Sequence, residues 1–198
     1  MTPFACALLL LVACQPRQMV VPIDPSAPPE IGITATFPGQ NSAVFEALEA
    51  AGAAPVFLHP PVEASAMSAL ADLDGLVLGG GADLDPALYG ETAHASTNLE
   101  DGTRQAMDLA LSRAAFEADV PLLGICLGAQ VMVVQRGGSL VQDIPSELPM
   151  ALDHHAPHSV AVEPGSPLAR LYPGPTLEVR SLHHQAADVL PAGFELAP

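Results

Sequence analysis

The chain has 198 residues, a length that suits one folded domain with a short appendage. Its 22 acidic side chains outnumber the six basic ones, which are all arginines, and the formal net charge is −16 at pH 7. Such a charge repels phosphate backbones and anionic lipid, so it argues strongly against a nucleic-acid-binding protein. The three cysteines, at positions 6, 14 and 126, are too few and too scattered for a disulfide framework or a structural zinc site.

The N-terminal segment is predicted to lie outside the fold. Residues 4–13 are almost entirely apolar, and this run is about half as long as a membrane-spanning helix requires. We therefore interpret residues 1–14 as a signal peptide. Its last four residues, Leu11-Val12-Ala13-Cys14, resemble the lipobox of bacterial lipoproteins, which implies cleavage before Cys14 and lipidation of the new N-terminal cysteine.

Residues 15–30 contain five prolines and are expected to form a linker between a lipid anchor and the domain. These features place the protein on the periplasmic face of a membrane. The alternative is that translation begins at Met19, which would give a cytoplasmic product without the apolar run.

From residue 31 to the end of the chain, apolar segments alternate between strand and helix patterns. The expected elements are strand 31–37, helix 41–51, strand 55–58, helix 64–71, strand 75–78, helix 102–118, strand 120–125, helix 128–136 and later strands at 159–162 and 177–180. Short, continuously apolar strands separated by helices indicate a parallel sheet that is covered on both faces. The predicted fold is an α/β domain over residues 31–198: a doubly wound, mostly parallel sheet in a flavodoxin-like three-layer sandwich.

The strongest chemical signal is Cys126, which lies where a predicted strand runs directly into a helix. Gly124 and Gly128 flank it at a spacing of two residues, as in the nucleophile elbow of hydrolases. The N-terminus of the helix offers unpaired N–H groups and the positive end of its dipole, which favour a thiolate. The N–H of Leu127 is the expected first donor to an oxyanion. The alternative is an inert cysteine at the end of a buried strand.

Three glycines, 79–81, follow the preceding predicted strand. Because parallel strands end at the same edge of a sheet, a backbone N–H of this loop is expected to reach the substrate of Cys126 as a second oxyanion donor. The carboxylates of Asp83 and Asp85 follow the loop and are interpreted as caps of turns and of the next helix, and not as metal ligands.

Two groups of histidines are candidates for a general base. One comprises His154, His155 and His158, and the other is the pair His183-His184. Their spacing alone allows either a cysteine–histidine pair or a zinc site. Pro157 interrupts any helix that would align His154 with His158, so we expect neither a metal nor a cofactor.

Four motifs, in order, resemble the gamma-glutamyl-gamma-aminobutyrate hydrolase family of the class I glutamine amidotransferase-like superfamily. They are DGLVLGGGADLDPALYG (74–90), PLLGICLGAQ (121–130), GGSLVQDIP (137–145) and SLHHQA (181–186). The resemblance implies a cysteine hydrolase that cleaves gamma-glutamyl amide bonds of small molecules through a thioester on Cys126. It also implies roles for residues around the nucleophile: an oxyanion hole made by Gly80 and Leu127, and a substrate pocket lined by Gly81, Gln130, His183, His184 and Gln185.

The chain departs from the family pattern in several places. Leu127 and Gln105 replace an arginine and an aspartate, and Val133 and Arg180 each replace an asparagine. The resemblance also implies a general base in a His-Pro-Glu motif, which the 198 residues do not contain. Three explanations are open: the chain is a fragment of a longer reading frame, the protein is a degenerate member without its base, or His183 or His184 acts as the base.

The sequence thus predicts a cysteine-dependent hydrolase of gamma-glutamyl amide bonds. One alternative is a glutaminase module that supplies ammonia to a synthetase. The other is a non-catalytic lipoprotein that binds a gamma-glutamyl or amino-acid ligand in the same pocket. Nothing in the sequence determines the leaving amine or the oligomeric state.

Overall fold

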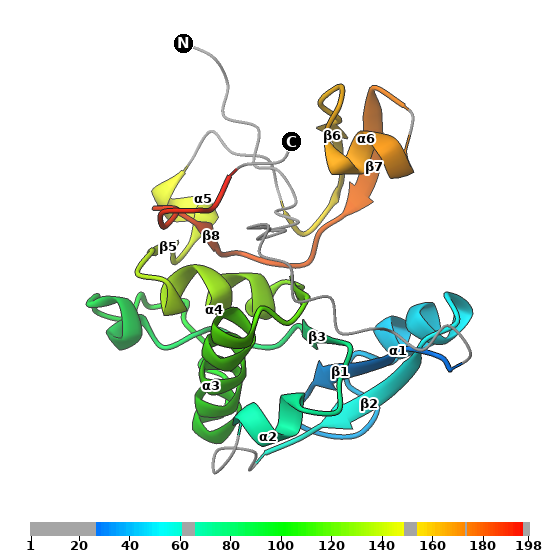
Figure 1. Ribbon diagram of the computed structural model, residues 1–198. Coiled ribbons are helices and arrows are strands. Elements are labelled where there is room, and N and C mark those ends of the chain that lie inside the picture. The colour runs from blue at the N-terminus through cyan, green and yellow to red at the C-terminus, as the bar shows by residue number, and fades with distance from the viewer. Residues whose placement is uncertain (1–26, 61–65, 149–153, 173, 196–198) are drawn as a thin grey trace.

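A four-stranded parallel sheet forms the centre of the computed structural model, which describes residues 27–60, 66–148, 154–172 and 174–195 (Figure 1). The strand order is β2-β1-β3-β4. The strands are β1 (Glu30–Thr34), β2 (Ala54–Leu58), β3 (Gly75–Leu78) and β4 (Leu122–Gly124). The predicted signal peptide, lipidation site and most of the predicted linker lie outside the described residues.

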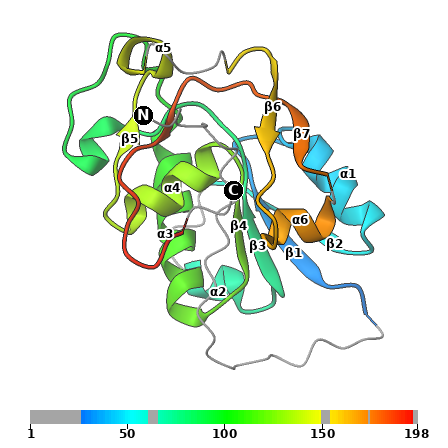
Figure 2. The ribbon, with the colours of Figure 1, turned by 90° about the horizontal axis from the view of Figure 1, so that it is seen from above.

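Three helices connect these strands and a fourth follows β4. The connecting helices are α1 (Ser42–Ala50), α2 (Ala66–Leu70) and α3 (Gly102–Ala118), and the fourth is α4 (Leu127–Gln135). Helix α1 packs on β2, whereas α2 packs against α3 and α3 against α4 (Figure 2). The chain moves in opposite directions along the sheet after β1 and after β2, and right-handed crossovers therefore place α1 on the face opposite α2 and α3. The predicted α/β fold with a parallel sheet and flanking helices is confirmed.

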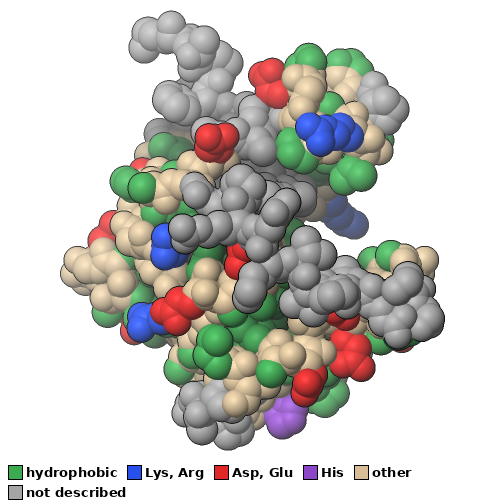
Figure 3. All heavy atoms as spheres, viewed as in Figure 1, with side chains coloured by type: hydrophobic (Ala, Val, Ile, Leu, Met, Phe, Trp, Pro, Cys, Tyr) green, Lys and Arg blue, Asp and Glu red, His purple; other side chains and the backbone are tan. Residues whose placement is uncertain are grey.

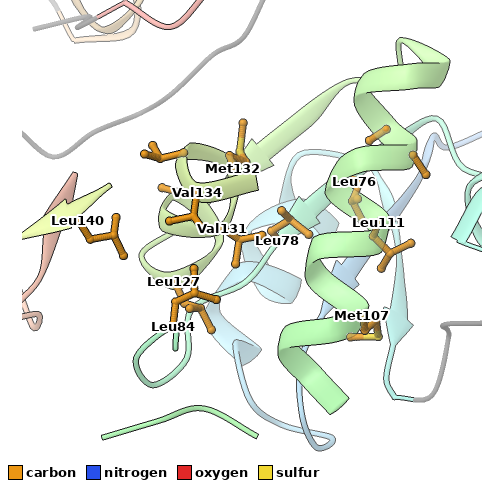
Figure 4. Close-up of a cluster of buried hydrophobic side chains, with 14 of the residues drawn as sticks. Leu76, Leu78, Leu84, Met107, Leu111, Leu127, Val131, Met132, Val134 and Leu140 are labelled. Atoms are coloured by element: carbon orange, nitrogen blue, oxygen red, sulfur yellow. The ribbon is translucent and has the colours of Figure 1, made fainter. Parts of the chain in front are cut away.

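The main core lies between β3 and the two helices α3 and α4 (Figure 4). Strand β3 is buried along its whole length, as expected for a central parallel strand. Helix α4 is buried on nearly all sides, whereas α3 buries Met107 and Leu111 in the core together with the polar side chains of Arg104 and Asp108. Cys126 therefore stands at the start of the most fully buried of these helices.

The predicted strands at 159–162 and 177–180 are present but do not extend the parallel sheet. They form the antiparallel pair of β6 (Pro157–Ala161) and β7 (Thr176–Arg180), with α6 (Pro167–Leu171) between them. This pair stands above the parallel sheet in Figure 1. Its side chains are mostly exposed or half-buried, which is the pattern of a strand pair that lies outside the core.

A second short antiparallel pair brings the late part of the chain to the central domain. It joins β5 (Leu140–Val141) to β8 (Ala186–Ala187). Two further short helices are η2 (Pro86–Tyr89), after β3, and α5 (Ile144–Glu147), after β5. The β5–β8 pairing holds residues 181–185 near the segment that enters α5, since the N–H of Ile144 donates to the His184 carbonyl over 2.7 Å.

Most boundaries differ from the predicted ones by one to three residues. The largest shift is at the strand predicted at 31–37, since β1 ends at Thr34. The strand predicted at 120–125 shortens to β4, because Val120 just beyond α3 still donates its N–H to the Ala115 carbonyl of that helix. Within the described part of the chain, no helix is both long and apolar enough to cross a membrane. Acidic side chains spread over several parts of the face drawn in Figure 3 and form no single patch.

Candidate functional site

The site lies at the carboxyl edge of the parallel sheet. Residues 79–81 leave β3 there, and Cys126 follows β4 by two residues. The strands are adjacent, with Leu78 opposite Gly124, and the N–H of Ile125 donates to the Leu78 carbonyl over 2.9 Å. The glycine loop and the cysteine are therefore brought together by the strand pairing, as the sequence predicted.

Cys126 occupies the sharp turn between β4 and α4. Its backbone angles are φ 54° and ψ −113°, which a residue with a side chain rarely adopts. The side chain is exposed to solvent at the N-terminus of the helix. A strained, exposed residue at this position is the geometry of a nucleophile elbow.

The glycines on either side of Cys126 allow the close packing that this turn needs. A Cβ atom on Gly128 would lie 2.1 Å from the Leu78 carbonyl oxygen, and one on Gly124 would lie 2.6 Å from the Ala129 nitrogen. Both neighbours are backbone atoms and cannot rotate away. A larger residue at Gly124 would force β4 and α4 apart, and one at Gly128 would force α4 away from β3.

Two backbone N–H groups act on the thiol, those of Leu127 and Gly81, and both lower its pKa. Neighbouring protein atoms remove part of the hydration of the sulfur, however, and this larger effect raises the pKa of Cys126 above its ordinary value. The negative charge of Asp83 acts in the same direction. The expectation that the helix N-terminus makes Cys126 a ready thiolate is therefore wrong for the free protein: desolvation outweighs the helix.

The glycine loop is held on both sides by polar side chains. The N–H of Gly79 donates to the Thr34 hydroxyl over 3.1 Å, and the Gly79 carbonyl accepts from Arg104 over 3.2 Å. Beyond the glycines, the N–H of Ala82 donates to Glu100 over 2.9 Å. These bonds fix the path of the backbone that presents the Gly81 N–H to the thiol.

Arg104 is a completely buried cation, a residue for which the sequence predicted no role. Besides its bond to Gly79, its Nε donates to Asp108 Oδ2 over 2.8 Å and its terminal nitrogen donates to the Thr34 hydroxyl over 3.1 Å. Burial raises the pKa of Asp108 to about 6, although the adjacent Arg104 opposes this rise. At neutral pH the pair is thus ionised and links α3 to β1 and to the glycine loop.

Asp83 and His184 form a second link between the loop and the rest of the site. His184 Nε2 lies 3.1 Å from each carboxylate oxygen of Asp83, and His184 Nδ1 lies 3.2 Å from Asp143 Oδ1. Both ring nitrogens are therefore engaged by carboxylates. A ring held in this way is not free to accept the thiol proton, which argues against His184 as a substitute base.

Asp83 is therefore more than the turn cap that the sequence indicated, although its Oδ2 does accept from the Asn98 N–H over 2.7 Å. Asp85 is a cap, as predicted: its Oδ1 accepts from the Ala87 N–H over 3.0 Å at the start of η2. Within the residues that the structure describes, no group of three or more histidine, cysteine or acidic side chains could hold a metal ion.

Comparisons with known proteins assign the family. The sequence profile described as Peptidase C26 matches residues 34–197. The chain belongs to the Peptidase C26 family. This result agrees with the resemblance seen in the motifs and places the chain among class I glutamine amidotransferase-like proteins, whose members are C–N hydrolases and amidotransferases.

Curated relatives of this Peptidase C26 chain include a candidate glutamine amidotransferase of Mycobacterium tuberculosis, which is 38% identical over 76% of this chain and 51% of the relative. The gamma-glutamyl-gamma-aminobutyrate hydrolase PuuD of Escherichia coli (strain K12) is 34% identical over 71% of this chain and 60% of the relative. The chain thus spans about half the length of the first of these and three fifths of the second.

Solved structures agree on the fold. A glutamine amidotransferase from Thermotoga maritima superposes with a TM-score of 0.59 and 15% identity, covering 84% of this chain and 69% of that one. A protein from Thermoplasma acidophilum, described as a candidate GMP synthase component, gives a TM-score of 0.61 and 21% identity, covering 85% of this chain and 71% of that one.

The family resemblance implied Leu127 and Gly80 as the oxyanion donors. Leu127 is the first residue of α4, and its N–H acts on the thiol. The second N–H that acts on the thiol belongs to Gly81, whereas the resemblance implied Gly80. Gly80 packs against the nucleophile, since a Cβ built on it would lie 3.6 Å from Cys126 Cβ. The role of Gly80 as a donor stays a prediction.

The predicted pocket residues of this Peptidase C26 member have different surroundings. Gln130 is half-buried on α4, whereas the side chain of Gln185 is buried and donates to the Gln142 carbonyl over 3.2 Å. His183 Nδ1 lies 2.9 Å from the Gln185 carbonyl. Burial lowers the pKa of His183.

The two predicted histidine groups meet in space. The His154 ring centroid lies 4.7 Å from that of His183 and 4.8 Å from that of His158. Substrate binding by Gln130, His183, His184 and Gln185 stays a prediction.

Sequence reasoning missed three residues that support the site: Asn41, Glu100 and Arg104. The Asn41 backbone is left-handed (φ 62°), and its amide donates to the carbonyls of Thr34, over 3.3 Å, and Gly80, over 3.4 Å. No local pattern marks these three side chains, because each acts on a loop that is 18 or more residues away in the sequence.

Proposed function

We propose that this Peptidase C26 member hydrolyses gamma-glutamyl amide bonds of small molecules through a thioester on Cys126. The observation that carries the proposal is the turn at Cys126, which exposes the thiol on a strained backbone, where the N–H groups of Leu127 and of Gly81 in the glycine loop both act on the sulfur. This arrangement combines a nucleophile with donors for a developing oxyanion.

In the proposed reaction, the Cys126 thiolate attacks the gamma-carbonyl carbon and forms a C–S bond. The carbonyl oxygen becomes an oxyanion that accepts from the Leu127 N–H and from the glycine loop. When the tetrahedral intermediate collapses, the C–N bond breaks and the amine leaves after taking up a proton. Water then attacks the thioester, releases glutamate and returns the thiol. In the family that the chain resembles, the proton transfers belong to a histidine of a His-Pro-Glu motif.

The raised pKa of Cys126 fits this sequence of steps if a general base activates the thiol. A thiol that is mostly protonated at neutral pH loses its proton to that base in the step that forms the C–S bond. The nearby Asp83 charge opposes a negative charge on sulfur, so it would disfavour the reverse step, in which the intermediate expels the thiolate. The rate would depend on a base that acts together with the nucleophile.

The choice of a gamma-glutamyl substrate rests on the relatives, of which PuuD is named a gamma-glutamyl-gamma-aminobutyrate hydrolase. The test is to incubate the full chain with gamma-glutamyl-gamma-aminobutyrate and with glutamine and to measure glutamate, amine and ammonia. Cys126→Ala is the control, and hydroxylamine should trap the thioester as a hydroxamate. Ammonia release from glutamine alone would favour the glutaminase alternative, and turnover by Cys126→Ala would contradict the mechanism.

A second candidate function is binding of a gamma-glutamyl ligand without turnover. The raised pKa of Cys126 favours it, because a thiol that stays protonated at neutral pH is a poor nucleophile but does not prevent a ligand from binding. Calorimetric titration with gamma-glutamyl-gamma-aminobutyrate distinguishes the two. Saturable binding by the wild-type chain, with no product after prolonged incubation, would support the binding protein.

A further inference from the structure

His184 joins three segments that are far apart in the sequence. Its Nε2 bonds to Asp83 in the loop after β3, and its Nδ1 bonds to Asp143, the N-cap residue of α5. Its own carbonyl accepts from the Ile144 N–H over 2.7 Å. The ring is therefore clamped between two carboxylates, and the glycine loop is tied to the late part of the chain.

Asp83 stands close to the nucleophile. It lies two residues after Gly81, whose N–H acts on the thiol, and Gly80 of the same loop packs against Cys126. The negative charge of Asp83 raises the pKa of Cys126, so the position of this carboxylate matters for the thiol. The His184 ring bonds to both Asp83 oxygens and so holds this carboxylate, and the loop that carries it, in one place.

We propose that His184 is a positioning residue of the nucleophile: through Asp83 it fixes the loop that carries the Gly81 N–H. The bond geometry carries this assignment, because a ring with both nitrogens held by carboxylates at 3.1 and 3.2 Å has one orientation. The inference rests on the hydrolysis proposed above. It assigns His184 to the organisation of the site and not to proton transfer.

Other ionisable groups surround His184 and its two carboxylate partners. Asp143 also accepts from Ser146, and its N–H donates to Glu147 Oε1 over 2.8 Å, so the outer side of the clamp is itself fixed. Hydrogen bonds from Ser146 and His184 lower the pKa of Asp143 to about 2, which keeps it ionised at every pH of interest. His183 is the nearest titrating neighbour along the chain, and its low pKa leaves it neutral above pH 7.

The test measures alkylation of Cys126 by iodoacetamide in the full chain, from pH 6 to 10. Mass spectrometry of the peptide that contains Cys126 separates it from the two other cysteines. We expect His184→Gln to slow alkylation at pH 8 by about threefold to tenfold, since it releases Asp83 and the loop that carries the Gly81 N–H. Asp83→Asn should accelerate it by a similar factor, because the amide oxygen can still accept from His184 while the negative charge is gone.

Asp85→Asn is the matched control, because Asp85 lies in the same loop but caps only η2. It should leave the alkylation rate within about twofold of wild type, a change that corresponds to less than half a pKa unit. The proposal is wrong if His184→Gln leaves the rate unchanged or raises it, or if Asp83→Asn lowers it. If His184 and Asp83 only stabilised the fold, both substitutions would change the alkylation rate of Cys126 in the same direction.

If His184→Gln does not fold, as judged by circular dichroism, His184→Asn takes its place and should slow alkylation likewise, because the shorter side chain also loses the bond to Asp83. In an active preparation, His184→Gln should also lower kcat by roughly 10- to 100-fold, with little change in KM. Alkylation needs no turnover. Failure of the proposed hydrolysis and failure of this inference are therefore distinguishable.

Discussion

Gly128 packs so closely on β3 that a Cβ atom would lie 2.1 Å from the Leu78 carbonyl oxygen. The contact joins the first turn of α4 to the strand that leads into the glycine loop, so it sets the separation between Cys126 and the Gly81 N–H. The same packing makes this glycine necessary for the fold as well as for the proposed chemistry.

We predict that Gly128→Ala lowers the free energy of unfolding by about 3 kcal/mol, since the added methyl group meets backbone that cannot move aside. Urea denaturation measures the change. Gly102→Ala is the matched control, because Gly102 has open space around it at the start of α3 and the substitution should be neutral or slightly stabilising. Equal effects in the two variants would show that the close approach to Leu78 is unimportant.

Alkylation of wild-type Cys126 should have a pH midpoint above about 8.5, the pKa of an unperturbed cysteine. Partial desolvation and the Asp83 charge raise the pKa of this thiol more than the Leu127 and Gly81 N–H groups lower it. The pH profile of iodoacetamide modification provides the measurement, with free cysteine as the reference. A midpoint below that of the reference would contradict the electrostatic account of the site.

Removing one partner of the buried Arg104–Asp108 pair should be costly. We expect Arg104→Met to lower the free energy of unfolding by about 3–5 kcal/mol at pH 7, because it leaves a buried carboxylate without its cation. The double variant Arg104→Met/Asp108→Leu should recover most of this loss, since no buried charge remains. A double variant as unstable as the single one would show that the bonds from Arg104 to Thr34 and Gly79 matter more than the ion pair.

Asp108 should also give the protein a measurable pH dependence. Its pKa is about 6 in the folded state and about 4 in an unfolded chain. Between these values the folded state keeps a proton that the unfolded state has lost. Its contribution to stability therefore falls by about 2–3 kcal/mol as the pH rises from 4 to 6 and is constant above that.

Urea denaturation of wild type and Asp108→Asn at several pH values tests this sign. The difference between the two proteins should change between pH 4 and 6 and stay level from pH 6.5 to 8. A difference that does not vary with pH would mean that Asp108 has an ordinary pKa.

The proposed lipid anchor can be tested independently of the site. In a bacterial host, the full chain should be cleaved before Cys14, and mass spectrometry should find the new N-terminal cysteine acylated. Cys14→Ala should abolish the modification, whereas Cys6→Ala should not, because Cys6 lies within the apolar run. An unmodified Cys14 in a chain that retains Met1 would contradict the anchor.

The sequence alone determined the features that depend on a few neighbouring residues. The order of strands and helices follows from local apolar patterns, and α3 has the predicted bounds of residues 102–118. The turn at Cys126 follows from two glycines at fixed spacing, which only a tight strand-to-helix junction requires. Four short motifs were enough to indicate the family that the comparisons then showed.

The tertiary structure decided what depends on residues that are distant in the chain. Three features belong to this class: the pairing of β6 with β7 outside the main sheet, the burial of Arg104, and the contacts of His184 with Asp83 and Asp143. Each joins segments that are far apart in the sequence, and no local pattern of residues predicts such contacts. The direction of the Cys126 pKa shift belongs here too. The helix N-terminus is a local feature and favours a thiolate, but desolvation is a sum over everything packed around the sulfur, and in this protein that sum is larger.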